Sequence, residues 1–63
     1  MNHVYKQRAA AEQDLVLFSK MNMHEDKVLA MVSVDGGFEI VHAAKVASYV
    51  CLMAVNGRVF KPV

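Results

Sequence analysis

Residues 27–42 read KVLAMVSVDGGFEIVH, and this stretch decides the fold that the sequence predicts. Three valines stand before the glycine pair at 36–37, and valine packs well on a pleated sheet but loses rotamer freedom in a helix. Asp35-Gly36 between two apolar runs is typical of a tight β-hairpin turn. We therefore expect a strand over residues 28–34, a turn at 35–37 and an antiparallel strand over residues 38–42.

The segment before this hairpin has a helical pattern. Val4, Ala11, Leu15 and Phe18 recur at helical spacing, and the alanines and long polar residues between them are strong helix formers. Asn2 is a suitable cap for the first turn. The sequence predicts a helix from residue 4 to residue 20, with these apolar side chains facing the rest of the fold.

Polar residues interrupt the apolar pattern between positions 21 and 26, so a connection is expected there. Asn22 and Glu25 also have the spacing of a capping box, which favours a second helix beginning near Met23. The valines that follow favour the connection.

The last third of the chain has two interpretations. In the first, residues 48–55 form a strand, Asn56-Gly57 forms a type I′ turn, and residues 58–63 form an edge strand that carries Pro62, so that four strands follow the helix as a meander. In the second, residues 43–55 form a helix that Gly57 caps. Propensity does not decide between them. The predicted class is α+β in a single domain, residues 1–63: an N-terminal helix packed on a small antiparallel sheet with turns at 35–37 and 56–57, or alternatively the order α-β-β-α-β.

Size and composition limit the function. The chain has 63 residues, is 56% hydrophobic and carries a formal net charge of +1, so it should fold but has little interior to spare for an enzyme pocket. One cysteine excludes an internal disulfide and a four-thiolate zinc site. We predict a non-enzymatic protein without a cofactor.

The residues that suggest chemistry do not form a motif. His24 and His42 are eighteen positions apart, and no histidine spacing matches a metal site, so His24 is expected in a solvated loop and His42 on a strand face. Cys51 lies among apolar residues, which is typical of a buried, unreactive thiol. No catalytic or metal-ligating residue is predicted.

The expected compartment is the cytoplasm. No basic start precedes an apolar signal core, a single unpaired cysteine suits a reducing compartment, and charged residues interrupt the apolar stretch at 38–55. Neither export nor a membrane span is expected.

The distribution of apolar residues predicts self-association. In the strands expected at 28–34 and 49–55, both sets of alternate side chains are apolar, whereas one N-terminal helix covers one face of a sheet. We therefore expect a homo-oligomer, most simply a dimer, in which a second copy covers the other face.

Two functions follow as hypotheses. The first is a small cytoplasmic interaction protein, a regulator or inhibitor that binds another macromolecule, a protein partner above all, as a homo-oligomer. The alternative is a small dimeric nucleic-acid-binding regulator whose contacts are the basic residues Lys6, Arg8, Lys45, Arg58 and Lys61.

Overall fold

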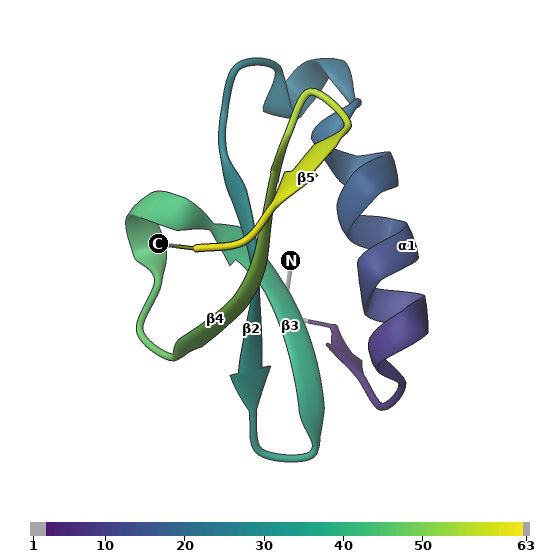
Figure 1. Ribbon diagram of the computed structural model, residues 1–63, viewed down its shortest axis with the longest axis vertical. Coiled ribbons are helices and arrows are strands. Elements are labelled where there is room, and N and C mark those ends of the chain that lie inside the picture. Colours follow the sequence, from purple (N-terminus) through teal and green to yellow (C-terminus); the bar gives the residue numbers. More distant parts are fainter. Residues whose placement is uncertain (1–2, 63) are drawn as a thin grey trace.

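The computed structural model describes residues 3–62 and shows one α-helix packed on a five-stranded antiparallel sheet (Figure 1). The elements along the chain are β1 (Val4–Tyr5), α1 (Arg8–Ser19), the short 3₁₀ helix η1 (Asn22–His24), β2 (Leu29–Val34), β3 (Gly37–His42), a second 3₁₀ helix η2 (Ala43–Lys45), β4 (Tyr49–Val55) and β5 (Arg58–Phe60). The predicted α+β class, with a helix first and the sheet after it, is confirmed.

The helix is shorter than predicted. Val4 and Tyr5 form β1, which pairs with β3 through Val4–Glu39 and Tyr5–Phe38, and α1 begins at Arg8. Pairing to a strand more than thirty residues away therefore prevails over the helical spacing of Val4 with Ala11, and valine and tyrosine both favour a strand. Asn2, the expected cap, lies outside the described residues.

The buried face of α1 agrees with the predicted one. Ala11, Leu15 and Ser19 are buried at four-residue intervals, and Phe18 packs against them from the side. The core that they share with the sheet consists of Tyr5, Ala11, Leu15, Leu29, Met31, Ile40, Leu52 and Ala54.

Both predicted hairpins are present. Gly36 has a φ of +86°, and Asn56 and Gly57 have φ values of +51° and +81°, the two positive values that a type I′ turn requires. The helical alternative for residues 43–55 is wrong, because β4 finds strand partners on both sides, β2 and β5. β5 is an edge strand that ends at Phe60, and Pro62 follows it.

The predicted meander is wrong, because the strand order is β1-β3-β2-β4-β5. β3 ends with His42 beside Leu29, whereas β4 begins with Tyr49 beside Ser33 at the other end of β2. Residues 43–48 must therefore run back along the sheet, and Figure 1 shows this crossover on the side of the sheet opposite α1. It explains why Ala30 and Val32, which point away from the core, are buried.

A bulge changes the alternation expected along β4. Met31 pairs with Leu52, but Val32 pairs with Val50, so that Cys51 is the extra residue. Because paired residues share a face of the sheet, Val50 lies on the same side as Val32 rather than with Leu52.

Residues 21–26 form a connection as expected, with the single turn η1 inside it. The capping box is absent: Met21 precedes the turn, and no side chain caps it.

Candidate functional site

The sheet face opposite α1 is the first candidate site, and we call it the open face. The strand registers place on it Val4, Ala30, Val32, Val34, Glu39, Val41, Val50, Met53, Val55, Arg58 and Phe60. All of these except Glu39 and Arg58 are apolar. A sheet face that borders only water normally carries polar side chains, so the open face has the composition of a surface that is covered.

Within residues 3–62, the chain covers only the centre of the open face. Ala30 and Val32 on the central strand are at most 2% exposed, whereas Val4 on β1 is 39% exposed and Phe60 on β5 is 41% exposed. The crossover therefore leaves apolar side chains uncovered toward both edges of the sheet.

A second candidate site is a pocket of about 540 Å³ at the end of the sheet where β3 finishes and β2 begins. Its walls are Lys27, Val28, His42, Ala43, Ala44 and Lys45. The backbone N–H of Ala43 donates to the carbonyl oxygen of Val28 at 2.9 Å, and this bond holds η2 against the start of β2. We call this site the basic pocket.

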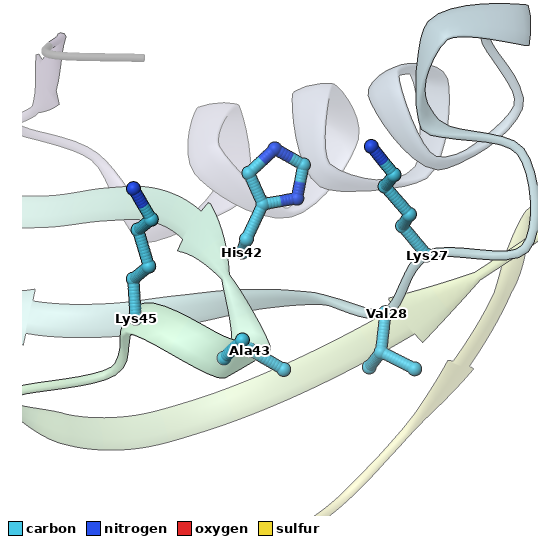
Figure 2. Close-up of a pocket in the computed structure, with 6 residues that line it drawn as sticks. Lys27, Val28, His42, Ala43 and Lys45 are labelled. Atoms are coloured by element: carbon cyan, nitrogen blue, oxygen red, sulfur yellow. The ribbon is translucent and has the colours of Figure 1, made fainter.

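Figure 2 shows how the charged side chains of the basic pocket are arranged. The His42 ring stands between Lys27 and Lys45, and all three side chains extend to the same side, while Val28 and Ala43 point to the other. Three separate segments supply these groups: the end of β3, the approach to β2, and η2.

A second histidine, His24, lies close to His42. The ring centroids of His24 and His42 are 5.1 Å apart, and His24 is buried rather than solvated as the sequence predicts. Its backbone N–H donates to Met21 and its carbonyl accepts from Lys27, which fixes η1 over the end of the sheet. The Nδ1 atom of His24 is buried and has no hydrogen-bond partner among the residues that the structure describes.

The surroundings of His42 disfavour its charged form. Loss of hydration is the largest cause that lowers the pKa of His42 below its usual 6.5, and the positive charges of His24, Lys27 and Lys45 lower it further. The neutral imidazole ring is therefore retained to a lower pH than in a free histidine.

The five basic residues predicted as nucleic-acid contacts lie in separate places. Lys6 follows β1 at one edge of the sheet, Arg8 is the first residue of α1, and Arg58 and Lys61 lie in or just after β5 at the other edge. Arg8 donates to Glu12 at 2.6 Å. Lys45 alone among the five lines the basic pocket, and its neighbours there, Lys27 and His42, carry no signal in the sequence because they are fifteen positions apart.

Two further findings concern function classes. Within residues 3–62, no helix is long and apolar enough to cross a membrane, and no three histidine, cysteine or acidic side chains lie together as metal ligands. Comparisons of the chain with protein-family models, curated proteins and solved structures found no match.

Proposed function

We propose that this protein is a non-enzymatic interaction protein, a small regulator or inhibitor, that acts as a homodimer assembled through the open face. The observation that supports the proposal is the uncovered apolar surface on that face, above all Phe60 on β5 and Val4 on β1. We assign it to the cytoplasm because its one cysteine, Cys51, is unpaired.

The size of the open face suits a second copy of the chain. Six residues of β2 at about 3.4 Å each and five strands at about 4.8 Å give a face of about 20 Å by 24 Å. Because the crossover already covers the centre of each face, two such faces in contact bury at most about 1,000 Å² in all, which is the range of weak, reversible interfaces.

A second copy of the chain also supplies the additional buried apolar contacts that a small core lacks. The core holds eight buried side chains, and within residues 3–62 no disulfide or metal cluster supplements it. Chains of this length commonly need a disulfide, a metal or a partner subunit for stability. Pairing through the edge of β5 is less suitable, because Arg58, Lys61 and Pro62 are the residues that block edge-to-edge pairing.

Light scattering coupled to gel filtration at micromolar concentration tests the proposal, with the expectation of a 14 kDa species that dissociates on dilution. Phe60→Lys places a charge on the open face and should give a monomer of lower stability. Leu17→Lys is the matched control, because Leu17 is exposed on the outer side of α1 and should leave the dimer unchanged. A wild-type chain that is a folded 7 kDa monomer at every concentration would overturn the proposal.

A further inference from the structure

We propose that the basic pocket is a binding site for the phosphate group of a small phosphorylated molecule, with Lys27, His42 and Lys45 as the anion ligands. The ligand class follows from charge, from the donor types and from the size of the pocket. The pocket includes the start of the crossover that lies over the open face. The phosphate proposal does not depend on the dimer, because all of its ligands come from one chain.

The pocket has positive charge without a balancing anion. Within residues 3–62, the one ion pair is between Arg8 and Glu12, so neither lysine has a carboxylate within ion-pair distance. An anion placed beside the two ammonium groups gains Coulombic free energy. The three side chains together provide the mobile N–H donors that phosphate oxygens accept.

A metal ion fits the same residues poorly. His24 and His42 are close enough to suggest a two-histidine site, but no third ligand joins them within the described residues. The two lysines beside them repel a cation. Charge therefore selects an anion over a divalent metal.

His24 restricts what His42 can do. His24 comes from η1 and is about nine-tenths buried. Its ring centroid lies 5.1 Å from that of His42, with the two rings tilted by 58°, so the His42 ring has a packed neighbour. The groups that face His42 are His24 from η1, Lys27 before β2 and Lys45 from η2, and all of them oppose its protonation. A phosphate dianion reverses this balance, so binding should be coupled to uptake of a proton at His42.

The dimensions favour a small molecule over a nucleic acid. A volume of about 540 Å³ is within the range of small-molecule sites, which is roughly 300–1,000 Å³. Val28, Ala43 and Ala44 also line the pocket, and Val28 and Ala43 point away from the three basic side chains, so they provide apolar wall for the organic group and not for the phosphate itself. A nucleic acid needs a track of cations along its backbone, whereas the other basic residues predicted as its contacts lie at the two edges of the sheet and at the start of α1.

Titration followed by NMR tests the proposal with three probes at constant ionic strength: inorganic phosphate, phenyl phosphate and a single-stranded DNA oligonucleotide. We expect saturable shift changes at residues 27–28 and 42–45 with both phosphates, tighter binding of phenyl phosphate, and a higher His42 pKa when phosphate is bound. Lys27→Met and Lys45→Met should each weaken binding about tenfold, the effect of one charged hydrogen bond. Lys20→Met removes the same charge from the end of α1 and should leave affinity unchanged.

Three results would overturn the proposal. The first is that neither inorganic phosphate nor phenyl phosphate causes saturable chemical-shift changes at His42. The second is an equal loss of affinity in Lys20→Met, which would indicate diffuse charge attraction rather than a site. The third is stronger binding of the oligonucleotide than of phenyl phosphate at the same residues, which would assign the pocket to nucleic acid. Dispersed spectra of each variant before titration establish that it is folded.

Discussion

The backbone N–H of Gly57 donates to the hydroxyl of Ser19 at 2.9 Å, although the two residues are thirty-eight positions apart. The same hydroxyl donates to the carbonyl oxygen of Val16 at 2.8 Å, so it serves as acceptor and donor at once. Ser19 is fully buried. One side chain therefore joins the last turn of α1 to the β4–β5 hairpin.

Replacing Ser19 by alanine should destabilise the protein. The change removes the acceptor of the half-buried Gly57 N–H, and the loss of one hydrogen bond costs about 1 kcal/mol. Urea denaturation measures the loss. Ser33→Ala is the control, because Ser33 is exposed on β2 and its removal should change the free energy of unfolding by less than about 0.5 kcal/mol. Equal stability of the two variants would contradict the role assigned to Ser19.

The two glycines of the β2–β3 hairpin should differ in their tolerance of alanine. At Gly36, φ is +86° and the space around a β-carbon is empty, so alanine costs the left-handed strain alone, about 1–2 kcal/mol. At Gly37, φ is +152° and a β-carbon would collide with the backbone carbonyl of Tyr5 in β1.

We therefore expect Gly37→Ala to cost about 3 kcal/mol or more, the sum of strain and steric overlap, and to release β1 from β3. Denaturation of the two single variants gives the comparison, and amide exchange at Val4 and Tyr5 reports on β1. Comparable stabilities, with β1 still protected in Gly37→Ala, would contradict the close approach of the two backbones.

Tyr5 should titrate at unusually high pH. Burial, followed by the hydrogen bond to Asp14 at 2.6 Å and the charge of that carboxylate, raises the pKa of Tyr5 to about 12. Absorbance of the phenolate in a Tyr49→Phe background isolates Tyr5. Asp14→Asn should lower the pKa of Tyr5 while leaving it above 10, because burial remains the larger cause.

The raised pKa of Tyr5 also predicts how the free energy of unfolding changes at alkaline pH. A raised pKa in the folded state contributes stability that is complete below pH 10, where both states keep the proton, and that disappears as pH rises through 12. The free energy of unfolding should therefore fall between pH 10 and pH 12, and less steeply in Asp14→Asn. Parallel profiles for the two proteins would contradict the contribution of Asp14.

The lowered pKa of His42 predicts that the free energy of unfolding decreases at acidic pH. Loss of hydration, and then the charges of His24, Lys27 and Lys45, hold the pKa of His42 below 6.5, so the unfolded chain takes up the proton first. Stability from this group is complete above pH 6.5 and decreases as pH falls toward the pKa of the folded state. His42→Gln should flatten the decrease in unfolding free energy below pH 6.5, as measured by urea titrations at several pH values. An unchanged slope would show that other groups cause it.

The local structure was largely predictable because short-range signals decide it. The turns at Asp35-Gly36 and Asn56-Gly57 depend on residues that tolerate positive φ, and the buried face of α1 depends on a repeat of three and four residues. The start of α1 was predicted too early because Val4 continues the helical spacing of the apolar residues, although valine and tyrosine themselves favour a strand, and the partner strand β3 is distant in the sequence. The strand order was equally hidden, because pairing of β4 with β2 rather than β3 leaves no mark in local composition.

One of the two candidate sites was predictable from the sequence and the other was not. The surplus of apolar side chains on both faces of the strands was visible in the sequence, and it led to the expectation of a dimer. The basic pocket was not visible in the sequence, because Lys27, His42 and Lys45 come from different segments. His24, which lies beside His42, was expected in a solvated loop.

The sequence by itself determined the class of fold, the two hairpin turns and the excess of apolar surface, since each follows from the conformational preferences of neighbouring residues. Only the tertiary structure decided that residues 43–48 cross the sheet opposite α1, which part of the apolar surface stays uncovered, and which cations share a pocket. These properties depend on contacts between residues distant in the chain, and the free energy of such contacts is set by the packing of the whole domain rather than by any local pattern.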